Sequence, residues 1–155
     1  MSRKLVIGAL NAMAITFSTA ALTEGTAVQA KVMLEKAVAA VKANKAKALD
    51  MFNKGEGGFL DRDLYVFCSN ISDGRLVADG NPNAKQIIGT DDRTLKDSTG
   101  KAFGQELFAA GRKPEGQISE VGYLFPKPGL DKTPVPKVSF VTRVGDIYCG
   151  VGYYK

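Results

Sequence analysis

The C-terminal part of the chain contains three segments with the composition of β-strands. They are residues 117–125, 137–144 and 147–154. Only Gly145 and Asp146 separate the last two, and a two-residue loop joins antiparallel neighbours. The proline-rich stretch 126–136 connects the first two. This pattern predicts a three-stranded antiparallel meander, which limits the fold to one with an antiparallel sheet.

The region before the meander combines a helix with a pair of strands. Residues 31–53 predict one long amphipathic helix, with Leu34, Val38, Val41, Ala48 and Phe52 on its apolar face. The helix is expected to end at the glycine-rich segment 55–58, because glycine has a low helix propensity. Residues 64–70 and 75–78 read as a strand and a short partner strand joined by a turn at 72–74.

The remaining segment, residues 79–101, is rich in Gly, Asn, Asp and Pro and predicts a loop with short helical pieces. A short helix is expected over residues 102–110, ended by Gly111. At 155 residues the chain has room for one domain. The order of elements predicts an α+β domain built on one antiparallel sheet.

The N-terminus has the three regions of a secretory signal peptide. Two basic residues precede an apolar run over residues 5–22, and Val28-Gln29-Ala30 provides small residues for a peptidase. We expect residues 1–30 to be a signal peptide cleaved after Ala30, or after Ala27 as a second choice. The protein would then be periplasmic or secreted. The alternative is an uncleaved membrane anchor, since about 18 apolar residues reach the lower limit of a spanning helix.

The two cysteines, Cys68 and Cys149, are an even number, and an exported protein folds in an oxidising compartment. They are therefore a candidate disulfide. Two buried, reduced thiols are the alternative that their spacing leaves open.

Composition argues against several functional classes. The 21 basic and 16 acidic residues are interspersed along the chain and give a net charge of +5, so no basic patch for nucleic acid is expected. The absence of histidine removes the base of common catalytic triads and the usual imidazole metal ligand. Two distant cysteines do not make a zinc site. We expect no catalytic residues, no cofactor and no metal.

Five segments of the sequence resemble the single Cache domain, an extracytoplasmic relative of the PAS fold. They are Asp63-Leu64-Tyr65-Val66-Phe67, Asp97-Ser98-Thr99-Gly100-Lys101-Ala102-Phe103, Tyr123-Leu124-Phe125-Pro126-Lys127-Pro128, Lys137-Val138-Ser139-Phe140-Val141 and Gly150-Val151-Gly152-Tyr153-Tyr154. The resemblance covers residues 31–155. It implies a five-stranded antiparallel sheet with a long N-terminal helix on one face. It also implies a ligand pocket on the other face, beneath a short helix and loops.

The resemblance further implies a domain of signal transduction that recognises small organic acids, amino acids or similar metabolites. The chain departs from the family where Val77-Ala78-Asp79-Gly80-Asn81-Pro82 replaces a His-Pro motif, and where Phe140 replaces a common tyrosine. We expect a free-standing binding protein, because no receptor module follows the domain in this sequence.

Strand alternation suggests which side chains would line the pocket. In the last strand, Gly150 and Gly152 share a face with Tyr148, so we expect a hollow beside these glycines. If Lys137 faces the same hollow, it could pair with a ligand carboxylate. If the first and last strands are neighbours, as the resemblance implies, both cysteines would lie on the opposite, aliphatic face. The candidate ligand-binding residues are Tyr65, Phe67, Tyr123, Phe125, Lys137, Phe140 and Tyr148.

Two functions are consistent with this pattern. The first is a domain that binds a small organic anion without catalysis. The alternative is a structural or interaction module, its pocket face filled by its own tyrosines, that docks on a membrane receptor or self-associates.

Overall fold

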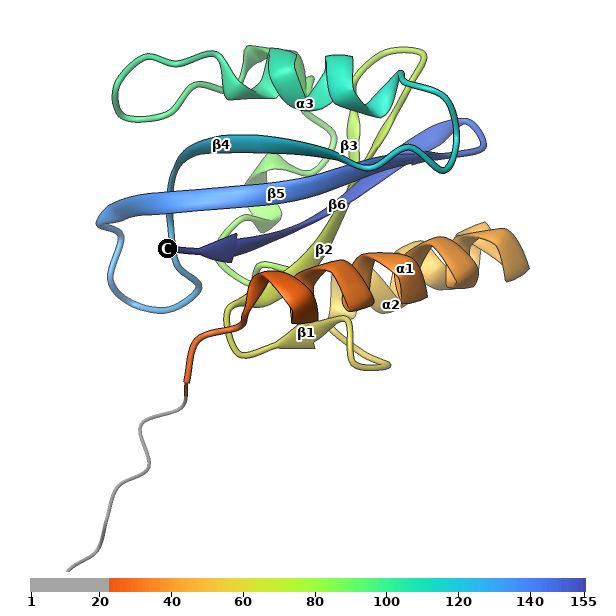
Figure 1. Cartoon of the computed structure of the whole chain (residues 1–155), viewed down its shortest axis with the longest axis horizontal. Coiled ribbons are helices and arrows are strands. Elements are labelled where there is room, and N and C mark those ends of the chain that lie inside the picture. Colours follow the sequence, from red (N-terminus) through yellow and green to blue (C-terminus); the bar gives the residue numbers. More distant parts are fainter. Residues whose placement is uncertain (1–22) are drawn as a thin grey trace, which may run out of the picture.

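The computed structural model describes residues 23–155, and the apolar run of the expected leader lies outside these residues. An antiparallel sheet with the order β1-β2-β6-β5-β4 forms the centre, and β3 pairs with β2. The strands are β1 Leu60–Asp61, β2 Leu64–Asn70, β3 Leu76–Asp79, β4 Ser119–Pro126, β5 Pro134–Val144 and β6 Ile147–Tyr154. This arrangement confirms the predicted α+β fold (Figure 1).

The strands follow the prediction closely, except that β5 begins inside the expected proline-rich connection. Pro134 and Pro136 pair with β4 on one side, whereas β6 reaches only as far as Lys137 on the other. A proline is tolerated there because one edge of the strand is largely unpaired. The two-residue strand β1 was not predicted, since it is too short to show an alternating pattern.

The prediction of one long N-terminal helix is wrong. The structure has two helices, α1 Ala27–Ala43 and α2 Lys45–Lys54, separated at Asn44. The Asn44 backbone is extended, and its side chain accepts a hydrogen bond from the Lys47 amide as the N-cap of α2. Asparagine favours this capping conformation over a helix interior. The apolar stripe continues across the break, with Leu34, Val41 and Phe52 buried.

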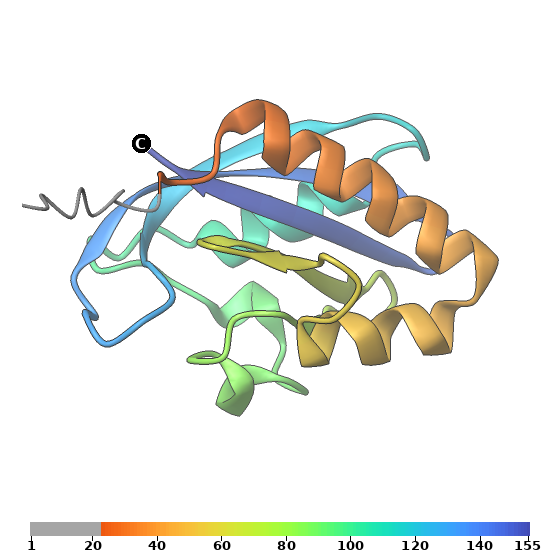
Figure 2. The same ribbon diagram turned by 90° about the horizontal axis from the view of Figure 1, so that it is seen from below.

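The two helices and the remaining elements cover opposite faces of the sheet. α1 and α2 lie on one face, and α3 Phe103–Gly111 lies on the other (Figures 1 and 2). Residues 80–102, which we call the roof, extend over the same face as α3 and contain short 3-10 turns at Lys85–Ile87 and Asp92–Thr94. The predicted short helix and the predicted loop with helical pieces are both confirmed.

The face toward α1 is held by apolar packing and a disulfide. Leu64, Val66, Ile147 and Val151 of the strands pack with the helix stripe in one buried cluster. Cys68 of β2 lies directly opposite Cys149 of β6 on this face, and the two form a disulfide with an S–S distance of 2.10 Å. The predicted pairing and its location on the aliphatic face are confirmed.

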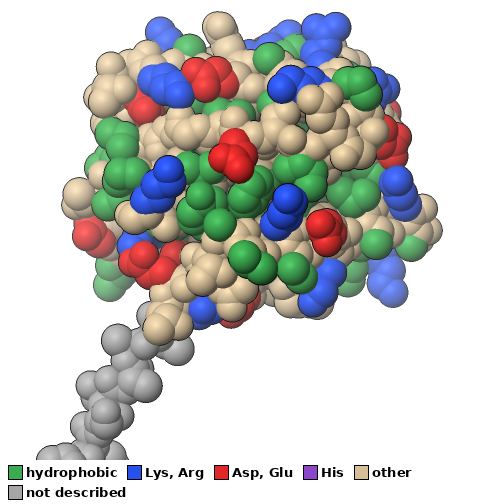
Figure 3. Space-filling view, in the orientation of Figure 1, with side chains coloured by type: hydrophobic (Ala, Val, Ile, Leu, Met, Phe, Trp, Pro, Cys, Tyr) green, Lys and Arg blue, Asp and Glu red, His purple; other side chains and the backbone are tan. Residues whose placement is uncertain are grey.

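No helix within residues 23–155 is long and apolar enough to cross a membrane. In the space-filling view, acidic and basic side chains are interspersed over the visible face (Figure 3). That face carries no continuous basic area of the kind that binds nucleic acid.

Candidate ligand pocket

A small pocket lies between the sheet and the roof, on the face away from α1. Five of the seven predicted ligand-binding residues line it: Tyr65, Phe67, Tyr123, Phe125 and Lys137. Its cavity volume is about 30 Å³, which is room for about one or two water molecules. The pocket is thus largely filled by the protein's own side chains.

The other two predicted residues do not line the cavity. Tyr148 lies on the same face but is buried beneath the roof, where its hydroxyl bonds to Asp92. The placement of Phe140 in the pocket is wrong, because Phe140 packs with the α1 cluster and stacks on Tyr153 at a ring distance of 5.8 Å. Phe140 and Lys137 are three residues apart on one strand, so alternation directs them to opposite faces.

The prediction of a hollow beside Gly150 and Gly152 is also wrong. A Cβ atom at Gly150 would lie 2.3 Å from Cζ of Phe67, and one at Gly152 would lie 2.2 Å from Cε of Lys137. The glycines therefore make room for these two side chains instead of leaving space for a ligand. The remaining cavity lies farther from the sheet, beneath the roof.

Lys137 is the chemically distinctive residue of the pocket. Its side chain is only 2% exposed, and Nζ donates a hydrogen bond of 2.6 Å to the Tyr65 hydroxyl. Nζ also lies 4.1 Å from the Tyr65 ring centroid and 5.1 Å from those of Phe125 and Tyr154, so aromatic faces stabilise the ammonium. Within residues 23–155, no carboxylate forms an ion pair with it.

Burial lowers the pKa of Lys137, and the negative charge of Asp79 opposes this shift. Asp79 is itself 5% exposed, and burial raises the pKa of its carboxyl group. Its Oδ1 accepts a 2.7 Å hydrogen bond from the Asn81 amide, and the Asn81 side chain donates to Tyr65 at 3.4 Å. A buried polar network therefore connects Asp79 to Lys137 through Asn81 and Tyr65.

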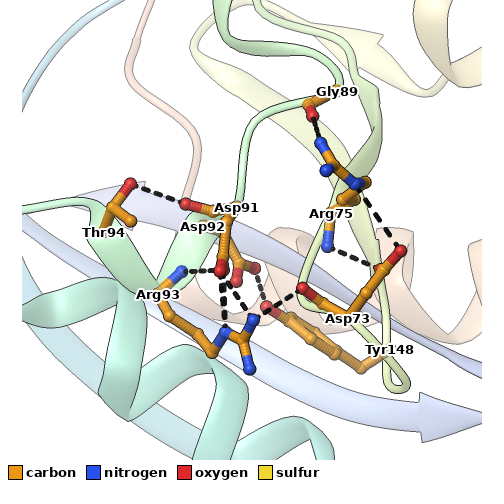
Figure 4. Close-up of polar contacts among 8 residues, drawn as sticks. All are labelled: Asp73, Arg75, Gly89, Asp91, Asp92, Arg93, Thr94 and Tyr148. Carbon is orange, nitrogen blue, oxygen red and sulfur yellow. Dashed lines mark hydrogen bonds and ion pairs between the residues drawn. The ribbon is translucent and has the colours of Figure 1, made fainter.

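A second polar cluster anchors the roof to the sheet and to the turn between β2 and β3 (Figure 4). Tyr148 of β6 donates a hydrogen bond to Oδ2 of Asp92. Arg93 forms an ion pair with Asp91 at 2.6 Å and donates to the carbonyl of Asp73 at 2.9 Å. Arg75 donates to the Gly89 carbonyl at 2.7 Å. This end of the roof is firmly attached.

Asp92 belongs to both the anchor and the pocket wall. Its side chain is 1% exposed, and burial raises its pKa to about 7, with the Ser69 hydroxyl acting in the opposite direction. Among the described residues, Oδ1 of Asp92 and Oγ of Ser69 have no hydrogen-bond partner of ordinary geometry. α3 packs tightly on this point, since a Cβ atom at Gly104 would lie 1.7 Å from the Asp92 carbonyl oxygen.

The other end of the roof forms only a thin wall. A surface groove of about 320 Å³ lies beyond the cavity and shares Ile87, Leu95, Phe103 and Phe125 with it. Lys96 and Lys132 also line this groove. The cavity and the groove are therefore separated by one layer of apolar side chains.

Sequence reasoning missed two buried acids, Asp79 and Asp92. It also missed the buried side-chain amide of Asn81. Their sequence context, Asp79-Gly80-Asn81-Pro82 and Asp91-Asp92, indicated turns, and such residues are usually exposed. The chain carries no local signal that these particular side chains turn inward.

Comparison with known proteins agrees with this architecture. The sequence profile of the family described as single Cache domain 2 matches residues 3–154. The chain belongs to this family. Cache domains of this kind are sensor domains and not enzymes, and no group of His, Cys, Asp or Glu within residues 23–155 could hold a metal ion.

Solved structures show the same Cache fold. A periplasmic sensor domain of a chemotaxis protein has a TM-score of 0.60 and 27% identity, over 81% of this chain and 87% of that one. A methyl-accepting chemotaxis protein from Vibrio parahaemolyticus RIMD 2210633 has a TM-score of 0.64 and 22% identity, over 82% of this chain and 86% of that one. No curated protein sequence matches the chain significantly.

Proposed function

We propose that this Cache domain is an extracytoplasmic sensor that binds a small carboxylate between the sheet and the roof. The similarity to a periplasmic chemotaxis sensor domain supports the location. The observation that carries the ligand class is Lys137, a buried amine on the pocket wall that has no carboxylate partner among the described residues. A ligand carboxylate would supply that partner.

The chemistry around Lys137 suits a carboxylate better than a neutral ligand. An ammonium donates three hydrogen bonds, and only the one to Tyr65 is made with a described residue. A carboxylate would add charge-assisted hydrogen bonds in a site sheltered from water, where such bonds are strong. Burial keeps Tyr65 protonated by raising its pKa, so its hydroxyl remains a donor as well as an acceptor.

Ligand binding requires the wall between the cavity and the groove to move. A cavity of about 30 Å³ is too small for a metabolite, whereas displacing Ile87, Leu95 and Phe125 would join it to the adjacent groove of about 320 Å³. The cluster around Asp92 would hold the opposite end of the roof in place. We therefore expect an induced opening of the wall and a ligand that reaches Lys137 from the groove.

Thermal-shift measurements with a panel of small acids test this proposal. The panel contains acetate, propionate, pyruvate, lactate and succinate, with acetamide and ethylamine as uncharged and cationic probes. At a hundredfold excess over Kd, a ligand stabilises its protein by about 2.7 kcal/mol. We expect at least one carboxylate to raise the Tm in proportion to the logarithm of its concentration, and the amide and amine to have no effect.

The variant Lys137→Met removes the amine and keeps an apolar stem of the same length. It should still fold, because methionine retains the alkyl packing of Lys137 on Gly152, and it should lose the response to the carboxylate. Lys31→Met is the matched control, since Lys31 lies over Phe140 on the opposite face. An equal response in Lys137→Met and in the wild type would contradict the proposed site.

The nearly filled pocket also favours the alternative of an interaction module without a small ligand. The same panel separates the two functions. A self-filled domain gains no stability from any of the acids, and this result in the wild type would replace the sensor proposal with the interaction module.

A further inference from the structure

The residues just before α1 are an integral part of the folded domain. The Gly25 amide donates a buried hydrogen bond of 2.7 Å to Oδ1 of Asp63, the residue before β2. A Cβ atom at Gly25 would lie 2.2 Å from Cγ of Leu64, so the backbone packs directly on that side chain. Asp63 is 8% exposed, and without this amide its Oδ1 would lose the one hydrogen bond that the structure gives it.

The first turn of α1 depends on residues that a late cleavage would remove. Thr26 is the N-cap, its hydroxyl accepts from the Gln29 amide, and the Gln29 side chain accepts from the Thr26 amide. This reciprocal capping box satisfies amides that have no partner within the helix. Ala30 is 0% exposed and belongs to the core between α1 and the sheet.

Two more contacts attach this segment to distant parts of the chain. The Arg62 guanidinium donates to the Thr23 carbonyl at 2.9 Å and to the Gln29 side chain at 3.1 Å. Glu24 forms an ion pair with Lys127, in the connection between β4 and β5. Residues 23–30 therefore contact three separate regions of the domain.

We infer that the signal peptide is cleaved before Thr23, at the peptide bond between Ala20 and Ala21. Cleavage after Ala27 would remove Gly25 and Thr26, and cleavage after Ala30 would also remove a core residue. Ser18 and Ala20 provide the small residues that the peptidase requires at the third and first positions before the cut. Water hydrolyses the bond and leaves a carboxylate on Ala20 and a new amino group on Ala21.

This inference rests on the leader prediction and is independent of the ligand proposal. It replaces the cleavage sites expected at Ala27 and Ala30 with one that keeps the capping box. The small residue Ala30 of the matching peptidase signal at Val28-Gln29-Ala30 has a structural explanation, since it is buried in the core between α1 and the sheet.

Mass spectrometry of the full chain after export from a Gram-negative host tests the site. We expect the mature protein to begin at Ala21, and a start at Leu22 or Thr23 also supports the inference. A start at Val28, at Lys31 or at any residue after Thr23 overturns it, as does an intact leader.

Two variants in the same host make the test independent of folding. The double variant A20K/A21K places charged residues at the proposed cut, and we expect the uncleaved precursor to accumulate. Val28→Lys is the matched control, because Val28 is 73% exposed and occupies the third position before Ala30. Normal cleavage of the leader in Val28→Lys supports the inference. The inference is overturned if Val28→Lys blocks cleavage and A20K/A21K does not.

Discussion

The two faces of the sheet are made from alternate residues of the same strands, yet they differ in the charged side chains that they bury. The face toward α1 buries aliphatic residues and the Cys68–Cys149 disulfide. The face toward the roof buries Lys137, Asp79 and Asp92 among tyrosines and phenylalanines. Burying charge lowers stability unless partners compensate for it. One face stabilises the fold, and we propose that the other is kept for recognition.

Removing the disulfide should have the largest effect on stability. The cysteines are 81 residues apart, and opening a loop of that size should destabilise the protein by about 4–5 kcal/mol through the entropy of the unfolded chain. Urea denaturation of the double variant C68A/C149A measures this change. A decrease in the free energy of unfolding of less than about 1 kcal/mol would show that the face toward α1 does not depend on the disulfide.

Substituting a glycine on the pocket face should have the next largest effect. Gly152→Ala places a methyl group against Lys137, and overpacking of this kind costs about 1–3 kcal/mol. Gly122→Ala in β4 is the control, because its nearest neighbouring atom would be 3.9 Å away. Equal unfolding free energies for the two variants would contradict the close packing of Lys137 on β6.

The buried Asp92 should make the stability of the pocket face depend on pH. The pKa of Asp92 is raised by burial to about 7, so between about pH 4 and pH 7 the folded protein retains a proton that the unfolded chain releases. This contribution is complete below pH 4 and is lost as the pH rises through 7.

The variant Asp92→Asn isolates that contribution. The difference in unfolding free energy between the wild type and Asp92→Asn should fall by about 1 kcal/mol for each pH unit between 4 and 7. Denaturation series at several pH values measure it. A difference that stays constant, or one that grows with pH, would exclude a protonated Asp92 in the folded state.

A surface ion pair should matter least. Lys45 and Asp146 are 2.6 Å apart but are 43% and 72% exposed, and exposed pairs typically contribute about 0.2–1 kcal/mol. Lys45→Met should therefore change the unfolding free energy by no more than about 0.5 kcal/mol, near the detection limit of denaturation. A larger loss would mean that α2 depends on this contact more than on its apolar stripe.

Local patterns predicted most of the fold but only part of the site. The limits of β2 and β6 and the turn at Gly145 follow from alternation and turn chemistry, which act over a few residues. The shared face of the two cysteines follows only when the strand order implied by the family resemblance is added. The helix break at Asn44 did not follow, because the apolar stripe continues across it. Helix propensity alone does not distinguish a capping asparagine from an exposed one.

The errors in the predicted site have a different cause. The prediction that both Phe140 and Lys137 line the pocket conflicts with strand alternation, which puts residues three positions apart on opposite faces. The hollow beside Gly150 and Gly152 was expected from missing side chains, but Phe67 and Lys137 from neighbouring strands occupy that space. Whether a gap stays open depends on packing across strands, which a single sequence does not specify.

The central claim is that Lys137 binds a carboxylate beneath the roof. A crystal structure of the protein with the acid that raises the Tm most would test it directly. We predict a carboxylate oxygen about 3 Å from Nζ of Lys137, with the side chains of Ile87, Leu95 and Phe125 displaced toward the groove. An acid bound elsewhere, with the Lys137 cavity unchanged, would contradict the account.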